Sequence, residues 1–292
     1  MKNIGIYSRK YFYNIFSHDY YVDFHYISFL GVFMIGIIGG SGVYDITKEA
    51  KTIEKKVLET PYGTSAEISL FEIHGKKVAF MARHSGDHSC PPHKINYRAN
   101  IWGLHSLGVN QIIATNAVGS LDIEIHPGSL VVVDDFIDFT SKREKSFYDD
   151  EVVHVDVTEP YCNRLRNQII ANKSIVTNGD FVEGGVYVCN EGPRFESPAE
   201  IRMFQKLGGD VVGMTGLPEA VLAREKEMCY VSICIVSNYG ASISPDKLTM
   251  DEVFEIMKLK AGEIIDLIYK TIETMDEEYD CPCSCALDGS GV

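Results

Sequence analysis

Positive charge is scarce in this sequence of 292 residues, where 27 lysines and arginines face 41 aspartates and glutamates and the formal net charge is −14. Such a balance argues against nonspecific binding to DNA, RNA or an anionic membrane, although a local cluster of Arg and His can still hold an anion. We therefore expect neither a nucleic acid nor a membrane as partner. Hydrophobic residues make up 45% of the chain, enough to bury a large core.

The sequence also lacks internal repeats and any linker rich in proline or serine, which favours one domain. Its eight cysteines lack the spacing of a small disulfide scaffold and are typical of a reduced cytosolic protein. The exception is the "CPCSC" tail, whose Cys281, Cys283 and Cys285 are too tightly spaced for a standard four-ligand zinc site. No partner pair is evident, so a redox or metal role and a flexible, solvent-exposed tail both stay open.

The first 33 residues lack the uninterrupted apolar stretch and the cleavage site of a signal peptide. The nearly charge-free stretch 27–44 is about long enough to span a membrane, but its glycines cluster at one end, as expected of a strand that runs into a turn. We expect a flexible extension over residues 1–33, a domain over 34–275 and a cysteine-containing tail over 276–292.

From Met34 onward, apolar runs alternate with segments of helical periodicity. The expected strands cover 34–40, 76–84, 111–121, 128–140, 210–216 and 228–238. The expected helices cover 96–108, 197–209, 217–227 and 248–278, and Ser197 with Glu200 forms a capping-box pattern. This order predicts a single α/β domain with a mixed sheet.

Polar residues stand where the expected strands end. They are Ser41, Arg83 with His84, Thr115 with Asn116, Thr215 and Asn238. Ligands of α/β sheets gather at strand ends, because the loops there can aim side chains and backbone N–H groups at one point. This convergence predicts a binding site.

Two of these segments have the chemistry of anion binding. "GGSG" (39–42) offers backbone N–H groups and the Ser41 hydroxyl, but Asp45 breaks a dinucleotide fingerprint and no P-loop lysine follows. "ARHSGDHSCPPHK" (82–94) combines Arg, His and Lys, which favours phosphate or carboxylate over a cation. A solvated loop and a metal site formed by His84, His88, Cys90 and His93 are the alternatives. In "NEGPRFESPAE" (190–200), Phe195 could stack on a flat heterocycle or simply anchor a loop.

Taken together and in order, these motifs resemble those of the trimeric purine nucleoside phosphorylase and methylthioadenosine phosphorylase family. They are "GIIGGSGVYD", "ARHSGDH" with "PPHKINYRANIWGL", "ATNAVGSL", "SFYDD" with "EPYC" and the histidine between them, "NEGPRFESPAE", "GMTGLPEAVLARE" and "SNYGAS". The resemblance covers roughly residues 34–270 and is similar, in "GMTGLPEA", to the methylthioinosine branch. It implies a single-domain nucleoside phosphorylase fold, a mixed twisted sheet flanked by helices. It also implies a homotrimer or dimer of trimers, with inorganic phosphate as cosubstrate and neither metal nor other cofactor.

The resemblance also assigns roles to positions of this chain. It implies catalytic roles for Asn238, Arg83 and His84. It implies phosphate binding by Ser41, Arg83, His84, Asn116, Ala117 and Thr215, although Asn116 departs from the threonine common in methylthioadenosine phosphorylases. It implies nucleoside binding by Ala117, Val118, Gly119, Phe195, Met214, Asn238 and Gly240, and by His154 lent from a neighbouring subunit.

The residue types at the end of "CIVSNYG" bear on the base. An amide such as Asn238 can donate to O6 or N7 and accept from N1–H of a 6-oxopurine, whereas a carboxylate only accepts. Methylthioadenosine phosphorylases carry two acids where this chain has Asn238 and Gly240, so the sequence favours hypoxanthine or guanine as the base. Glu196 stands where those enzymes have a small serine and is a further candidate for reading the base.

The last helix bears on the 5′ substituent of the nucleoside. Met250, Val253 and Phe254 form an apolar stripe and no histidine lies between 245 and 260, which favours a methylthio group over a hydroxyl. The same stripe is typical of the core face of any amphipathic helix. We expect phosphorolysis of methylthioinosine, with inosine or guanosine tolerated. Methylthioadenosine phosphorolysis, a nonenzymatic purine binder and a dinucleotide-dependent oxidoreductase are the alternatives.

Overall fold

The structure, a computed structural model, describes residues 34–40, 43, 46, 50, 53–86, 89–245, 249–276 and 279–291. The extension expected over residues 1–33 and the predicted phosphate ligand Ser41 lie outside the described residues, as does the side chain of Met250. In the described ranges, none of the helices is both long and apolar enough to cross a membrane.

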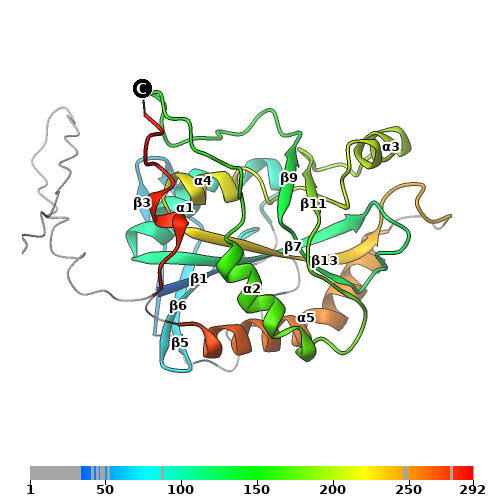
Figure 1. The fold of residues 1–292 in the computed structure, drawn as a ribbon, viewed down its shortest axis with the longest axis horizontal. Coiled ribbons are helices and arrows are strands. Elements are labelled where there is room, and N and C mark those ends of the chain that lie inside the picture. Colours follow the sequence, from blue (N-terminus) through cyan, green and yellow to red (C-terminus); the bar gives the residue numbers. More distant parts are fainter. Residues whose placement is uncertain are drawn as a thin grey trace, which may run out of the picture. The chain divides into compact units, whose positions relative to one another are not determined.

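The centre of the domain is a run of parallel strands in the order β13-β7-β1-β6 (Figure 1). Their bounds are β1 Met34–Gly39, β6 Lys76–Ala82, β7 Val109–Ser120 and β13 Cys229–Tyr239. Antiparallel pairing then adds β8 (Leu130–Val132) beside β13, and β5 (Ile68–Ile73) with β2 (Glu54–Lys56) beside β6. The short β10 (Phe181–Val182) runs parallel to β8. The predicted mixed sheet is confirmed.

A second part of the sheet branches from the far end of β7. There Gly119 and Ser120 pair antiparallel with β12 (Val211–Gly213), which continues through β11 (Val186–Cys189) to β9 (Asp135–Asp138). A small separate hairpin joins β3 (Glu59–Thr60) to β4 (Gly63–Thr64). Because β7 and β13 extend past β1, their carboxyl ends lie at the fork between the two parts of the sheet.

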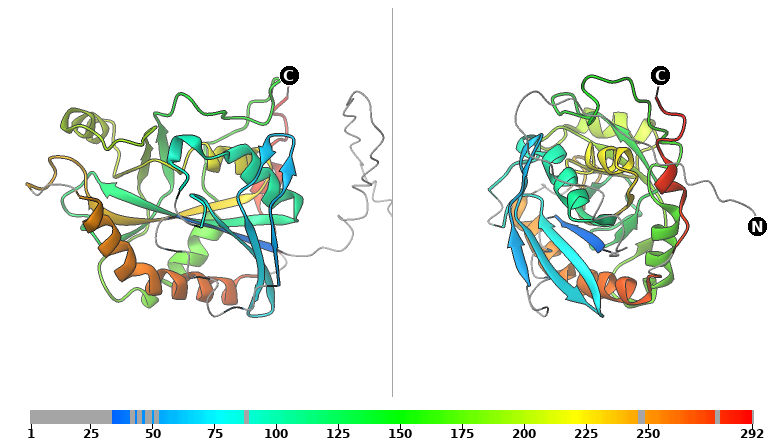
Figure 2. Two further views of the ribbon diagram at one scale, coloured as in Figure 1. Left: turned by 180° about the vertical axis from the view of Figure 1, so that it is seen from behind. Right: turned by 90° about the vertical axis from the view of Figure 1, so that its left-hand side faces the viewer.

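Helices cover both faces of the central strands (Figure 2). Helices α1 (Tyr97–Ser106) and α4 (Glu219–Glu225) pack on one face, and α2 (Asn163–Ala171) and α5 (Met250–Thr274) on the other. Strand β13 shows why its sequence is apolar throughout. Tyr230, Cys234 and Val236 pack in the core under α1 and α4. Val231, Ile233 and Ile235 pack in the core under α2 and α5, as expected when side chains alternate along a strand covered on both faces.

Helix α3 (Pro198–Lys206) begins as the sequence predicts. The Ser197 hydroxyl accepts a hydrogen bond from the backbone N–H of Glu200, and the Glu200 carboxylate accepts one from the backbone N–H of Ser197. Strands β2 to β5 and helix α2 were not among the expected elements, because their apolar residues follow no clear period within such short segments.

The C-terminal segment differs from expectation. Among residues 279–291, Cys281 and Cys283 are each only 5% exposed and pack in the same core as α2 and α5. A 3₁₀ turn, η5 (Pro282–Cys285), brings them there, and Val153 forms a β-bridge with Gly291. The flexible, solvent-exposed tail considered as an alternative is therefore wrong for these residues, because they are held by apolar burial and backbone pairing.

Candidate active site

A cavity of about 550 Å³ opens at the fork of the sheet, where strands β1, β6, β7, β12 and β13 end. It brings together many of the predicted residues. Those that line it are His84, Ala117, Val118, Gly119, Phe195, Glu196, Met214, Thr215, Asn238 and Val253. A shallower hollow of about 720 Å³ beside α3 is lined by surface residues such as Asp122, Arg202 and Gln205 and receives none of them.

Asn238 reaches the cavity because β13 contains an extra residue. The pairing with β7 is regular as far as Val236 and Val118, then shifts so that Asn238 pairs with Gly119 and Ser237 is left over. Such a bulge re-aims the side chains that follow it. The Asn238 amide donates to the Tyr239 carbonyl at 2.8 Å and accepts from the Ser237 hydroxyl at 2.8 Å. These bonds use one of its two amide hydrogens, so the other can serve a ligand.

Two glycines make room around Asn238. A Cβ on Gly119 would stand 3.1 Å from the Asn238 amide nitrogen. A Cβ on Gly240 would stand 3.0 Å from both Ile201 and the Ser120 carbonyl oxygen, which is tighter than ordinary contact. Any side chain at position 240 would therefore be crowded, and Gly240 itself does not line the cavity.

Arg83 is 1% exposed and sits behind the cavity wall. Glu219 accepts two hydrogen bonds from its guanidinium, each 2.7 Å long, and the Thr115 carbonyl accepts a third of 3.0 Å. Burial alone would lower the pKa of Arg83, but the attraction of the Glu219 carboxylate outweighs it, so the pKa is raised. The Tyr230 hydroxyl also donates to Glu219, at 2.7 Å.

Arg83 Nη1 lies close to Gly40, the residue that follows β1. A Cβ on Gly40 would stand 3.3 Å from Arg83 Nη1 and only 2.5 Å from the Thr115 carbonyl oxygen. Glycine at position 40 thus lets the turn, and the cavity in front of it, approach the guanidinium. The Gly40 N–H itself donates to the Thr115 hydroxyl at 3.0 Å, so it is not available to an anion.

Asn116 is fully buried, and both ends of its amide are used inside the fold. Its nitrogen donates to the Ser232 hydroxyl at 2.7 Å, and its oxygen accepts from the Thr215 hydroxyl at 2.7 Å. Thr215 lines the cavity, whereas the Asn116 side chain holds Thr215 in place. The Asn116 side chain therefore does not line the cavity, and the Thr215 hydroxyl could donate to phosphate only by turning from Asn116 to the ligand.

The loop after β6 is held by an exchange between His84 and Cys90. The ring Nδ1 of His84 bonds the Cys90 carbonyl at 2.8 Å, and the Cys90 N–H donates to the His84 carbonyl at 3.0 Å. The carbonyl contact makes Nδ1 the donor and turns Nε2 away from Cys90. Among the residues described, no group able to hold a metal ion includes His84, Cys90 or His93, and His88 lies outside them.

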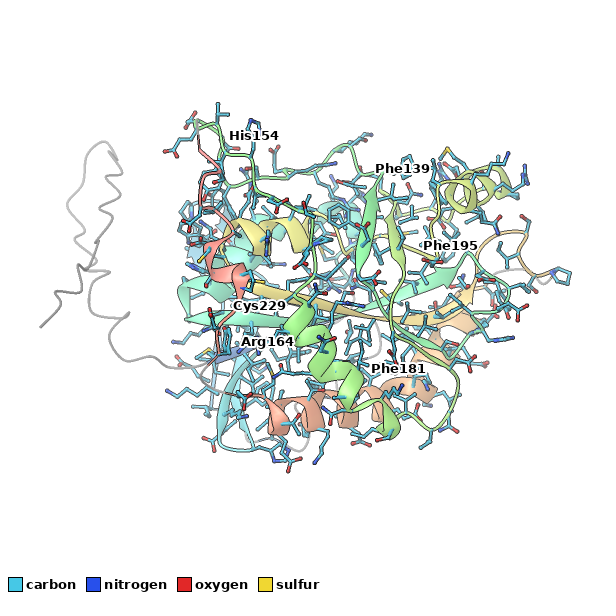
Figure 3. The ribbon with its side chains drawn as sticks, viewed as in Figure 1. Phe139, His154, Arg164, Phe181, Phe195 and Cys229 are labelled. Carbon is cyan, nitrogen blue, oxygen red and sulfur yellow. The ribbon has the colours of Figure 1, made fainter. Side chains whose placement is uncertain are left out.

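The opposite wall of the cavity carries an aromatic ring and an acid. Phe195 is 40% exposed and lies near the end of the segment leading to α3, just before the N-cap residue Ser197 (Figure 3). Beside it, Glu196 accepts a hydrogen bond of 3.1 Å from the Asn190 amide. Burial raises the pKa of Glu196 from its ordinary value of 4.5. Met214 packs against Gly192, where a Cβ would stand 2.6 Å from its sulfur.

The residues of the predicted apolar stripe on α5 do not all face the cavity. Val253 is buried and lines the cavity, whereas Phe254 is 49% exposed and lies outside the lining. His154 is exposed and lies on the far side of the chain from Phe195 (Figure 3). Its backbone N–H donates to the Ser290 carbonyl at 2.8 Å. The cavity of the same chain is therefore out of its reach.

Residues that sequence reasoning missed are Glu219, Tyr230 and Ser232, which support Arg83 and Asn116 from behind. A signal was available for Glu219 only, as an acid just after a proline at an expected helix start. In the sequence, nothing distinguishes Tyr230 and Ser232 from other residues of a buried strand.

Comparison with known proteins gives consistent matches in sequence and in fold. A model of the phosphorylase superfamily matches residues 34–273. A probable S-methyl-5′-thioinosine phosphorylase of Methanothermobacter thermautotrophicus is 60% identical over 259 residues, covering 89% of this chain and 90% of the relative. The 6-oxopurine nucleoside phosphorylase of Pyrococcus furiosus is 50% identical over 265 residues, covering 88% and 98%. Methylthioadenosine phosphorylase from Schistosoma mansoni, solved with adenine, aligns with a TM-score of 0.82 at 29% identity, covering 89% and 99%.

Proposed function

The chain belongs to the phosphorylase superfamily, and we propose that it is a pentosyltransferase that splits a purine nucleoside with inorganic phosphate. The preferred substrate in this proposal is S-methyl-5′-thioinosine, which yields hypoxanthine and 5-methylthioribose 1-phosphate. The observation that carries the proposal is the single cavity that unites Asn238, Phe195 and Glu196 with His84 and Thr215. One side has the groups that suit a purine, and the other has those that suit phosphate.

In this reaction the bond between ribose C1′ and purine N9 breaks, its electrons leave with the base, and a phosphate oxygen bonds C1′. Positive charge builds on the sugar and negative charge on the base. Phosphate beside His84, Thr215 and the turn at Gly40 lies close to the cationic carbon and then attacks it. Arg83 lies behind that turn in a buried ion pair with Glu219; the pair has no net charge, so its role here is to hold the wall of the site in place. Phosphate is the cosubstrate, and we propose no other cofactor for the reaction.

The amide of Asn238 supports the choice of a 6-oxopurine. Its free amide hydrogen can donate to N7 or O6 of the departing base, where negative charge develops. Phe195 provides the stacking surface. Glu196 is able to accept from N1–H of hypoxanthine or from the 2-amino group of guanine, provided that it is ionised. A site built of such groups rejects a base that leaves them unpaired.

Val253 favours a methylthio group as the 5′ substituent, because it places an apolar side chain in the cavity wall. The discrimination available from apolar contact alone is about 1–3 kcal/mol, so inosine and guanosine should also react. Relatives named for both activities, the thioinosine phosphorylase of M. thermautotrophicus and the 6-oxopurine phosphorylase of P. furiosus, support this breadth.

We further propose that the enzyme assembles as a homotrimer or a dimer of trimers, in which His154 enters the cavity of a neighbouring subunit. The support is that His154 is exposed and remote from the cavity of its own chain (Figure 3). Replacing His154 by Ala should then raise the KM for the nucleoside without changing the KM for phosphate.

The test is phosphate-dependent release of base from methylthioinosine, methylthioadenosine, inosine and guanosine, compared as kcat/KM. We expect hypoxanthine release from methylthioinosine to be fastest. Faster release of adenine from methylthioadenosine would leave the reaction class intact and overturn the role of Asn238. Absence of turnover with every nucleoside, at saturating phosphate, would instead favour a purine binder.

A further inference from the structure

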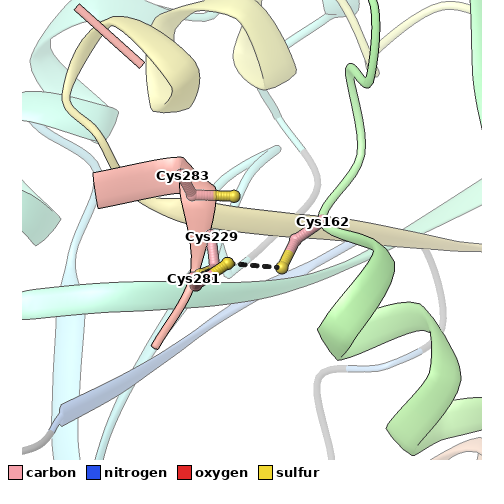
Figure 4. Close-up of side chains that lie close together, drawn as sticks. All are labelled: Cys162, Cys229, Cys281 and Cys283. Atoms are coloured by element: carbon pink, nitrogen blue, oxygen red, sulfur yellow. Dashed lines mark hydrogen bonds between the residues drawn. The ribbon is translucent and has the colours of Figure 1, made fainter. Parts of the chain in front are cut away.

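Four cysteines from three separate parts of the chain meet away from the cavity: Cys162, Cys229, Cys281 and Cys283 (Figure 4). All four are buried, and their sulfur atoms lie within 4.8 Å of one another. Cys281 Sγ stands 3.5 Å from both Cys162 Sγ and Cys229 Sγ. This group of four cysteines is referred to below as the thiol cluster.

Two of the sulfur–sulfur distances in the thiol cluster are close to those of a metal site, and all of the sulfurs lie within 4.8 Å of one another. Zinc binds thiolate sulfur at about 2.3 Å in a tetrahedron, which places neighbouring sulfurs about 3.8 Å apart. A disulfide would need about 2.05 Å between two of them. The 3.5 Å separations are thus near the tetrahedral value and far from the covalent one.

The surroundings also favour thiolates. Cys162 is the N-cap residue of α2, where the helix dipole stabilises negative charge. Arg164 donates to Cys229 Sγ at 3.7 Å, and its guanidinium lies 3.8 Å from the centroid of the Tyr279 ring. An N–H group that donates to a ligand sulfur, from a positively charged side chain, is the usual support of a thiolate metal site.

Cysteine binds a metal ion as the thiolate, so the thiol cluster would release protons when it takes up a divalent cation.

We propose that Cys162, Cys229, Cys281 and Cys283 bind one Zn²⁺ as a closed tetrathiolate site. With four protein ligands and no open position, such a site is structural. Tetrahedral thiolate sites select zinc or iron among the common divalent metals, and the redox-inactive ion suits a site that only fastens chain segments. This proposal departs from the expectation that the protein takes no metal, and it is independent of the proposed reaction.

The zinc ion would tie the C-terminal segment to the start of α2 and to the first residue of β13. That segment in turn holds the loop around His154, through the bond from His154 N–H to the Ser290 carbonyl and the bridge between Val153 and Gly291. Loss of the metal should therefore free residues 279–291 and the Val153–His154 stretch together, while the cavity residues stay protected.

The experiment is elemental analysis of the full chain, expressed with zinc and iron in the medium and purified under reducing conditions without chelator. We expect one zinc per chain. The double variant Cys281→Ser with Cys283→Ser should contain no zinc, with faster hydrogen exchange at 153–154 and 279–291. Cys285→Ser is the matched control, because Cys285 is exposed in the same 3₁₀ turn and outside the thiol cluster; it should keep the metal.

A measurement on the unaltered chain guards against a double variant that does not fold. Zinc is displaced by a mercurial thiol reagent, the reagent is removed with excess thiol, and Co²⁺ is added. We expect the intense absorption of a tetrahedral cobalt–thiolate centre at one equivalent. Four reactive thiols with no bound metal, two disulfides, or iron in place of zinc would each overturn the proposal.

Discussion

The two ends of strand β13 show how one element can serve opposite purposes. Its amino end, Cys229, lies in the thiol cluster, and its carboxyl end presents Asn238 to the cavity. The two residues are nine positions apart, which at about 3.3 Å per residue is about 30 Å. At the amino end the thiols contact one another and the space is closed. At the carboxyl end a bulge and small neighbouring residues leave polar groups free to bind a ligand.

The comparison shows that a polar residue at a strand end is not enough to identify a binding site. Cys229 begins the apolar run of β13 and Asn238 follows it, yet only Asn238 lies beside glycines that keep space open. Between the two ends, Tyr230 and Ser232 reach into the groups that support Arg83 and Asn116. The strand therefore links a rigid anchor, a buried polar layer and a cavity.

The largest effect is expected from that middle layer. Glu219→Ala would leave the buried guanidinium of Arg83 without its carboxylate partner, at a cost of about 3–5 kcal/mol in the free energy of unfolding. Urea denaturation measures it. Glu219→Gln, which keeps the shape and one acceptor, should cost less. A loss below about 1 kcal/mol for the alanine variant would mean that water or another group pairs with Arg83.

At the carboxyl end, Asn238→Asp should lower kcat/KM for methylthioinosine by about 10²–10³-fold, the usual cost of losing one donor to developing negative charge. Methylthioadenosine, whose 6-amino group suits a carboxylate, should lose much less. Steady-state kinetics on both nucleosides measure the change. Zinc content at the other end of β13 should not change, and an equal fall for both nucleosides would contradict the assignment of Asn238 to the base.

The smallest effect, a change of about tenfold or less in kcat/KM for guanosine, is expected when the pH is varied. The pKa of Glu196 is raised above 4.5 because the carboxyl is buried. Below that raised pKa the acid is protonated and cannot accept from the base, so kcat/KM for guanosine should fall as the pH falls through it. The free energy of unfolding should change in the opposite direction. A carboxyl with a raised folded-state pKa stabilises the fold while it is protonated, and this contribution is lost as the pH rises through that pKa.

Glu196→Gln separates these two trends. The variant should lose both the acid limb of the kcat/KM profile and the matching pH dependence of the free energy of unfolding. Asp122→Asn is a control from the surface hollow beside α3 and should change neither. If the acid limb persists in Glu196→Gln, a group other than Glu196 controls it.

Much of the architecture was predictable, because long apolar runs and caps act locally. The strands over β1, β6, β7 and β13 and the capping box of α3 were expected and are present. Segments such as β2, β10 and α2 were not, since they are too short for periodicity and are held by pairing and packing with remote residues. For the site, the motifs marked His84, Thr215, Asn238 and Phe195, which the structure places around one cavity.

The sequence by itself determined the family, the order of the central strands and helices along the chain, and the residue types at the strand ends. Only the tertiary structure decided which of those residues face the cavity. Asn116 and Arg83 turn inward to buried partners, because an unpaired polar group in a core is costly. The structure likewise brought Cys162 and Cys229 to the "CPC" tail. Their separation along the chain hides a meeting that depends on how α2, β13 and the C-terminal segment pack together.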